Sequence, residues 1–276
     1  MSLGPAAEAD YYGARGFDEQ HAAEVRSFYL PYVEGRRLLV ELGCGRGEFL
    51  SLAQPIVEQV CGVDVDPKMV QLARARGFTV IEDDVRSYLR QVDDNPDTFF
   101  AAHLIEHFSV QDAFGLLTEV HHALAPDGLV ILATPNPACL AMLTNDFWSD
   151  PTHVRLYTPE LLRFLLQQAG FEIVDEGGNP NDTPGPPPHL LAADLLEPWG
   201  SLADTLGDAA ALPEVPSEGV RELSDEVLLL RHIVVTLDER LRALRHVAGH
   251  AIERHNDTLR FLYGANEIFV VARRLP

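Results

Sequence analysis

Residues 41–47 read Glu41-Leu42-Gly43-Cys44-Gly45-Arg46-Gly47, an acidic residue followed by three glycines at alternate positions. An apolar run that begins at Leu38 precedes them and the helix-like residues Glu48-Phe49-Leu50 follow, so the stretch predicts a turn between a buried strand and a helix. Glycines in such a turn let the backbone approach a ligand where a Cβ would collide. The third glycine comes one residue too early for the dinucleotide fingerprint G-x-G-x-x-G, which argues against NAD. The stretch therefore predicts another nucleotide-type site.

Apolar segments of strand length recur along the chain, and most are separated by helical patterns. The predicted strands are 38–43, 57–64, 78–83, 98–104, 129–134, 171–175 and 267–273. Strands that alternate with helices form right-handed βαβ units, and their parallel sheet binds ligands at the carboxyl ends of the strands. We expect an α/β, Rossmann-like fold with a mostly parallel seven-stranded sheet, helices on both faces and a helical insertion before the last strand.

The composition predicts three parts. Residues 1–175 and 267–276 are expected to form the α/β domain. Residues 176–219 are rich in Pro, Gly, Asp and Ala and hold no Lys or Arg, which is typical of a loop or cover segment. Residues 220–266 predict a long helical arm, because apolar residues recur at spacings of three and four from Val220 to Ala251. This heptad seam (220–251) predicts a homodimer or a partner helix, or else packing within the same chain.

The chain is strongly acidic, since 42 Asp and Glu against 21 Lys and Arg give a formal net charge of −21. Nucleic-acid binders are steered to phosphates by basic surfaces, so we expect no nucleic-acid partner. No apolar run is long enough for a membrane span, and three widely spaced cysteines fit reduced thiols, so we expect a cytoplasmic protein.

Acidic residues follow the second and third predicted strands. Asp64 closes the second strand about 20 residues after the glycines, where a carboxylate could accept both hydroxyls of a ribose. Asp84 follows the third strand and could accept the adenine amino group. Either residue alone could be only a helix cap, but a glycine turn and two acids in this order favour a cofactor site.

Four stretches, Val40–Leu50, Gly62–Met69, Ile81–Val85 and His103–Phe108, together resemble the motifs of class I S-adenosylmethionine (SAM)-dependent methyltransferases. The resemblance implies the fold of that family, SAM as the cofactor and methyl transfer as the activity. It implies that the glycines lie beside the methionine part of SAM, that Asp64 binds the ribose, that Asp84 and the backbone of Val85 bind the adenine, and that His103 lies near the sulfonium. The implied cofactor-binding residues are Glu41, Gly43, Gly45, Gly47, Asp64, Asp84, Val85 and His103.

Later segments are similar to bacterial methyltransferases from polysaccharide and O-antigen gene clusters. They are Asn136-Pro137, Phe147–Arg155, Tyr157–Glu160 and Phe261–Gly264. This resemblance implies O-methylation of a sugar or glycan hydroxyl, or of a glycan-end phosphate. Two alternatives stay open: a small phenolic or quinone-like acceptor, which would need a more apolar pocket, and a non-catalytic SAM-binding scaffold.

Polar residues collect after the fifth predicted strand and supply the catalytic candidates. A neutral imidazole at His153 could take the proton of an acceptor hydroxyl, Asp150 could orient that ring, and Arg155 could hold an anionic group. The alternative is that Asp150-Pro151-Thr152 is only a turn and His153 a packing residue. Methyl transfer can also proceed mainly by positioning donor and acceptor in line.

The stretch His103-Leu104-Ile105-Glu106-His107 also fits H-x-x-E-H, the inverted zinc-peptidase motif. That mechanism needs both histidines on one face of a helix. His103 falls at the end of a predicted strand, so the two imidazoles are expected to diverge. We therefore expect neither a peptidase nor a metal site.

Overall fold

The computed structural model describes residues 19–140, 142–143, 147–183 and 264–275, together with Arg240, Arg242, His246, His250, Arg254 and Thr258. The chain divides into two units, Met1–Gly185 with Tyr263–Pro276, and Pro186–Leu262. Residues 176–183 of the predicted cover segment are described and belong to the first unit. The rest of that segment and the heptad seam lie outside the described residues, apart from the six single residues, which are helical.

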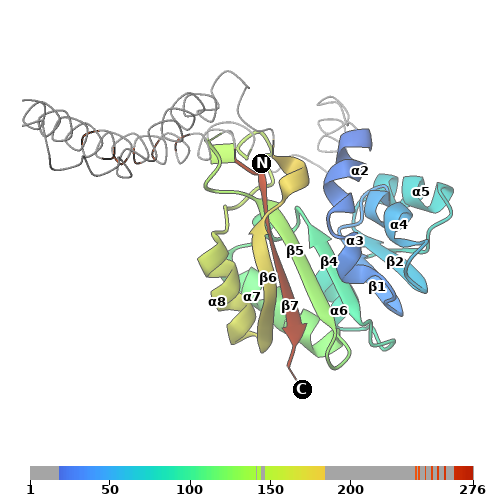
Figure 1. Cartoon of the computed structure of the whole chain (residues 1–276). Coiled ribbons are helices and arrows are strands. Elements are labelled where there is room, and N and C mark those ends of the chain that lie inside the picture. The colour runs from blue at the N-terminus through green and yellow to red at the C-terminus, as the bar shows by residue number, and fades with distance from the viewer. Residues whose placement is uncertain are drawn as a thin grey trace, which may run out of the picture. The chain divides into compact units, whose positions relative to one another are not determined.

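The first unit is built on a seven-stranded sheet with the strand order β3-β2-β1-β4-β5-β7-β6 (Figure 1). The first five strands run parallel, and β7 lies antiparallel between β5 and β6. The predicted Rossmann-like fold with a mostly parallel seven-stranded sheet is confirmed. The strands are β1 (Leu38–Leu42), β2 (Gln59–Asp64), β3 (Val80–Glu82), β4 (Thr98–Ala102), β5 (Leu129–Pro135), β6 (Phe171–Gly178) and β7 (Glu267–Arg274).

Side chains of the central strands alternate between two apolar cores, as the period of two in a strand requires. In β4, Phe99 packs into one core and Phe100 into the other. In β5, Val130 and Ile131 divide in the same way. Both faces are buried, so the strands read as continuous apolar runs, which is the pattern that made them predictable.

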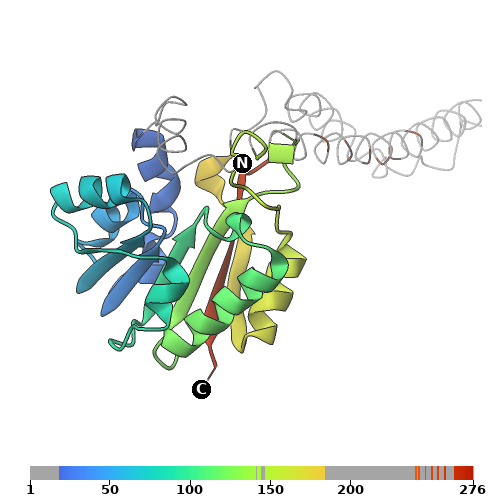
Figure 2. The same cartoon turned by 180° about the vertical axis from the view of Figure 1, so that it is seen from behind.

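Helices cover both faces of the sheet (Figures 1 and 2). Tyr29, Phe49 and their neighbours form the core beneath α2, α3 and α4, while Leu116, Leu165 and their neighbours form the core beneath α6, α7 and α8. Thr158 accepts a hydrogen bond from the backbone N–H of Leu161 and caps α8, as predicted. The bounds are α2 Glu19–Ser27, α3 Leu30–Val33, α4 Glu48–Ala53, α5 Pro67–Ala75, α6 Val85–Leu89, η1 Ile105–His107, α7 Val110–Ala123, α8 Pro159–Gln168 and η3 Pro180–Asp182.

Two strands, β4 and β6, end more than one residue away from the predicted position. β4 stops at Ala102, not near residue 104, because His103 adopts a left-handed backbone with φ of +52° and leaves the ladder. β6 continues to Gly178, past the expected boundary at residue 175, because Glu176, Gly177 and Gly178 still pair with β7. Among the described residues, no helix combines the length and apolarity that crossing a bilayer requires.

Candidate active site

The glycine turn connects β1 to α4 in three left-handed steps. The φ values of Gly43, Gly45 and Gly47 are +73°, +52° and +82°, a region that side chains with a Cβ rarely adopt. A Cβ on Gly47 would lie 2.8 Å from the Phe78 ring, while one on Gly45 would meet, among the described residues, only Glu48 Oε2, at 3.7 Å. The turn therefore packs tightly beneath Gly47 and stays open above Gly45.

Asp64, at the carboxyl end of β2, ties this turn in place. Its Oδ2 accepts a hydrogen bond of 2.8 Å from the backbone N–H of Gly45, and its Oδ1 accepts one of 2.9 Å from that of Asp66. Burial raises the pKa of the Asp64 carboxyl, against the lowering effect of these backbone bonds. Asp64, the residue predicted to bind the ribose, is thus in direct contact with the predicted glycine turn.

Three other predicted cofactor residues lie in β1 or directly after β3. Asp84 Oδ1 accepts from the backbone N–H groups of Arg86 and Ser87 and so caps α6, next to the buried Val85. Glu41 is buried within β1, and burial raises its pKa well above the usual range. Among the described residues, Glu41 Oε2 has no hydrogen-bond partner. The adenine role of Asp84 and Val85 stays a prediction.

His103 lies between two carboxylates at the end of β4. Its Nε2 is 2.8 Å from Glu267 Oε2, and its Nδ1 is 3.3 Å from Glu106 Oε1. Burial favours the neutral ring, but the two carboxylates outweigh it and raise the pKa of His103 to about 9. About 41% of its side-chain surface is accessible, so His103 presents a cation at the edge of the sheet. The position of His103 near the sulfonium of SAM stays a prediction.

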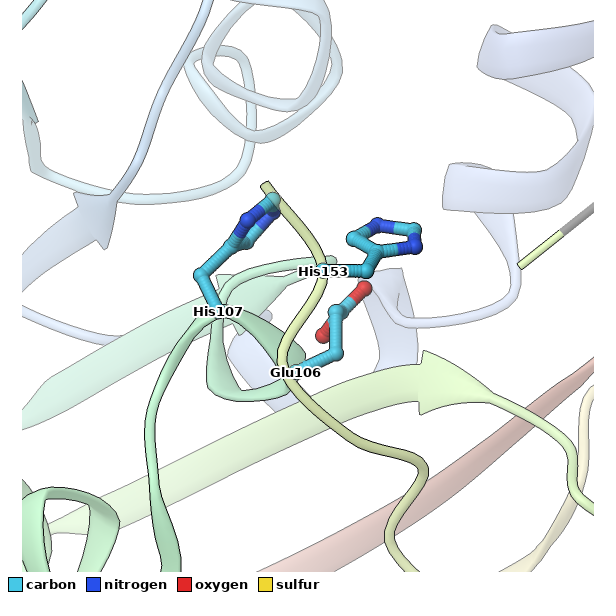
Figure 3. A group of neighbouring side chains, drawn as sticks. All are labelled: Glu106, His107 and His153. Carbon is cyan, nitrogen blue, oxygen red and sulfur yellow. The ribbon is translucent and has the colours of Figure 1, made fainter. Parts of the chain in front are cut away.

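Glu106, His107 and His153 form a cluster (Figure 3), and Glu106 also contacts His103. One carboxylate oxygen of Glu106 and one nitrogen of each imidazole lie within 4.8 Å of one another. Glu106 and His107 come from η1, and His153 comes from the segment after β5. The two segments are joined by backbone bonds, since the carbonyl of Glu106 accepts from the N–H groups of Val154 and Arg155.

Hydrogen bonds fix the proton positions on both rings. His153 Nδ1 lies 2.7 Å from the carbonyl oxygen of Phe147, which can only accept, so Nδ1 carries the proton. The Thr152 hydroxyl donates to Asp150 Oδ1 at 2.6 Å, so it must accept from His107 Nδ1, 2.9 Å away. In each ring Nε2 is therefore the nitrogen that carries a lone pair when the ring is neutral. Burial lowers the pKa of His153, which favours this neutral form.

The three predicted catalytic residues, Asp150, His153 and Arg155, lie in the segment between β5 and α8. Asp150 Oδ2 lies 3.7 Å from His153 Nε2, so these two side chains are neighbours, as predicted. Arg155 directs its guanidinium over the Tyr157 ring, 5.1 Å from the centroid, and donates to the carbonyl of Leu156. In this arrangement Arg155 packs against an aromatic face.

A family profile described as a methyltransferase domain matches residues 14–176. The chain belongs to the class I SAM-dependent methyltransferases. The cofactor of this family is SAM. The matched region contains the glycine turn, Asp64 and the Glu106–His107–His153 cluster.

Curated methyltransferases resemble this region at moderate identity. A protein of Mycolicibacterium smegmatis named "Probable S-adenosylmethionine-dependent methyltransferase" is 32% identical over 146 residues, covering 51% of this chain and 54% of that protein. A ubiquinone biosynthesis O-methyltransferase of Cereibacter sphaeroides (strain ATCC 17025) is 30% identical over 178 residues, covering 58% of this chain and 70% of that enzyme. The chain thus spans about half the length of the first relative.

Solved structures share the methyltransferase fold. A SAM-dependent methyltransferase from Archaeoglobus fulgidus superposes with a TM-score of 0.61 at 24% identity, covering 94% of this chain and 96% of that one. A Haloferax volcanii methyltransferase solved in complex with the Trm112 activator superposes with a TM-score of 0.59 at 16% identity, covering 98% of this chain and 95% of that one. At these identities the likeness concerns the fold alone.

The sequence analysis does not include Glu106 and His107 among the candidate site residues, although the structure brings both together with His153. Both belong to the H-x-x-E-H stretch, whose motif pairs His107 with His103 and not with His153. The divergence of those two rings is confirmed, because His103 turns to Glu267 and His107 turns to Thr152. The useful signal was the pair Glu106-His107 directly after β4 combined with a histidine after β5.

Proposed function

We propose that this chain is a SAM-dependent O-methyltransferase that acts on a hydroxyl group bound at the Glu106–His107–His153 cluster. One observation carries the proposal: the cluster and the glycine turn share one edge of the sheet, where neighbouring strands β1 and β4 end. A Cβ on Gly43 would lie only 3.3 Å from Leu104 Cδ1, two residues before Glu106. A donor at the turn and an acceptor at the cluster would therefore be neighbours.

The residues of the turn fit the cofactor. SAM supplies an electrophilic methyl group when it is bound. The open space above Gly45 admits a ligand close to the backbone, and a carboxylate has about four acceptor sites, so Asp64 can hold ribose hydroxyls while it anchors the turn. Asp84 and Val85 are proposed to border the adenine, as the family motifs imply.

The cluster fits a hydroxyl acceptor. The neutral ring of His153 has a lone pair on Nε2 that can accept a hydroxyl proton, and Asp150 Oδ2, 3.7 Å from the same nitrogen, would stabilise the imidazolium that results. The side chains are held by Phe147, Thr152 and the backbone of Glu106, so their geometry is preorganised. His153 as the base, with Asp150 as its orienting carboxylate, remains our proposal, and Arg155 is proposed only to border the acceptor.

A sugar or glycan hydroxyl is our first choice of acceptor, supported by the likeness of the segment 147–160 to methyltransferases of polysaccharide gene clusters. The second choice is a small phenol or quinol, favoured by the similarity to the Cereibacter enzyme. Incubation of the full chain with methyl-labelled SAM and two matched panels, sugars with lipid-linked glycans and catechols with quinols, separates them. We expect label in the first panel. Transfer only to phenols would reverse the choice, and SAM binding without transfer to either panel would favour a scaffold.

The heptad seam 220–251 is proposed to bind a second copy of the chain or a helix of another protein. The proposal is supported by the sequence pattern alone.

A further inference from the structure

We propose that Glu106, His107 and His153 hold a divalent first-row transition-metal ion, with Zn²⁺ as the best fit, and that this ion binds the acceptor hydroxyl. The position of the acceptor rests on the function proposed above, but the metal site rests on the geometry of the three side chains. Their potential ligand atoms lie within 4.8 Å of one another and come from two segments that meet at the sheet edge (Figure 3).

The groups behind the two histidines are those that accompany metal-binding imidazoles. A ligating histidine generally donates its second ring N–H to a carbonyl or carboxylate, which fixes the tautomer and the ring orientation. His153 donates to the Phe147 carbonyl, and His107 donates to Thr152, which in turn donates to the Asp150 carboxylate. Both rings are thus set with Nε2 as the ligand atom.

Glu106 offers the third ligand atom. Its side chain is fully buried, and Oε2 accepts a 3.0 Å hydrogen bond from the Thr134 hydroxyl. Among the described residues, Oε1 receives no well-directed hydrogen bond, although His103 Nδ1 lies 3.3 Å away. A buried carboxylate oxygen without a donor is costly, and such a group calls for an ion or another partner.

Packing alone does not account for this arrangement. The His153 ring stacks on Phe147 with 4.6 Å between centroids, which a structural histidine would also do. Packing does not explain why two imidazoles and a buried carboxylate, from two segments, bring potential ligand atoms within 4.8 Å of one another, with His103 facing the same carboxylate from another side. A bound cation would be attracted by the carboxylate and by the lone pairs of the neutral rings.

The ligand types select the ion. Two imidazoles and one carboxylate suit zinc, iron or cobalt, whereas magnesium and calcium prefer oxygen ligands. Three protein ligands leave a position open, as in catalytic zinc sites, and the acceptor oxygen would fill it. With the ion bound, Nε2 of His153 is a ligand, so the ion replaces the His153 base proposed above and the hydroxyl proton passes to solvent. The oxygen–methyl bond forms as the sulfur–methyl bond of SAM breaks, and the electron pair of that bond stays on sulfur.

Metal binding is tested without SAM or acceptor. His246 and His250, with Nε2 atoms 3.2 Å apart on one helix, could capture zinc separately, so both are changed to Ala in every protein used. Titration of the metal-free full chain with Zn²⁺ should give one ion per chain, Co²⁺ should give the visible spectrum of a low-coordinate nitrogen–oxygen site, and Mg²⁺ should not compete. His107→Ala and His153→Ala should remove the site, and Thr152→Val should weaken it roughly 10- to 100-fold. His122→Ala, an exposed histidine of α7, is the matched control.

The Co²⁺ spectrum of the otherwise unchanged chain keeps the test valid if a variant fails to fold. Absence of zinc uptake, or equal affinity in His107→Ala and His122→Ala, would overturn the site. Full transfer by the metal-free chain would overturn the role of the ion and leave the O-methyltransferase proposal intact. Zinc binding without transfer to any hydroxyl would overturn the O-methyltransferase proposal and leave the metal site intact.

Discussion

His103, at the end of β4, and Glu267, at the start of β7, form an ion pair with 2.8 Å between Nε2 and Oε2. The Glu267 carboxylate is buried and also accepts hydrogen bonds from Tyr29, Arg26 and Asn179. Burial alone would raise the pKa of Glu267, but the bond and the charge of His103, helped by Arg26, lower it to about 2. One carboxylate thus connects the candidate active site to α2 and to the segment after β6.

The first prediction is that this carboxylate makes folding stability depend on pH in the acid range. Because the pKa of Glu267 is lower in the folded chain than its ordinary value of 4.5, its interactions stabilise the fold fully above that value and are lost as the pH falls toward 2. Glu267→Gln should lower the unfolding free energy at neutral pH and flatten its decline below about pH 4.5. Urea denaturation of both proteins over this range measures it. Parallel curves for the two proteins would contradict the prediction.

A second prediction concerns the cofactor. Asp64→Ala removes the carboxylate that anchors Gly45 and is proposed to bind the ribose, and the loss of a charged hydrogen bond costs about 1.5–3 kcal/mol. SAM affinity measured by calorimetry should therefore fall roughly 10- to 100-fold. Gly45→Val, which forces a β-branched residue to a φ of +52°, should have the same effect. Asp93→Ala, in the exposed loop before β4, is the control, and wild-type affinity in both site variants would refute the assignment.

A third prediction separates backbone strain from steric collision at two glycines. Gly47 and Gly77 both have left-handed backbones, but an added Cβ would collide with Phe78 at Gly47, whereas at Gly77 it would meet no atom of the described part of the chain within 4 Å. Gly77→Ala should cost only the conformational penalty of about 1–2 kcal/mol. Gly47→Ala should cost about 1–3 kcal/mol more, because Phe78 must move. Chemical denaturation gives both values, and equal destabilisation would show that Phe78 yields freely.

A fourth prediction follows from the heptad seam in the sequence. Exposure of a large aliphatic side chain forfeits roughly 1.5–3 kcal/mol of burial, so a continuous seam is expected to be covered. Light scattering of the full chain should give a dimer or a larger complex, and Leu237→Asp with Leu241→Asp should give a monomer. A monomer of unchanged stability in both proteins would leave the seam without a partner.

The sheet was predictable because its strands are apolar runs with buried faces, and the glycine turn was predictable because its backbone tolerates only glycine. The order of the last two strands was not predictable, since nothing local in 267–274 shows that this segment enters between β5 and β6. The same limit applies to the site. Asp64 meets Gly45 across adjacent strand ends, which topology implies. The contact of Thr152 with His107 depends on how an irregular segment crosses η1, and no spacing in the sequence encodes it.

The position of β7 has a consequence for how the chain is made. The ribosome synthesises β5 and β6 well before residues 267–274. These two strands do not pair with each other in the finished sheet, because β7 lies between them and pairs with both. Until β7 emerges, β5 carries an unsatisfied hydrogen-bonding edge, the kind of surface that chaperones and aggregation both recognise. The sheet can therefore be completed only after β7 has been synthesised. Because β7 also carries Glu267, the partner of His103, completion of the sheet and of the active-site edge occur together and late.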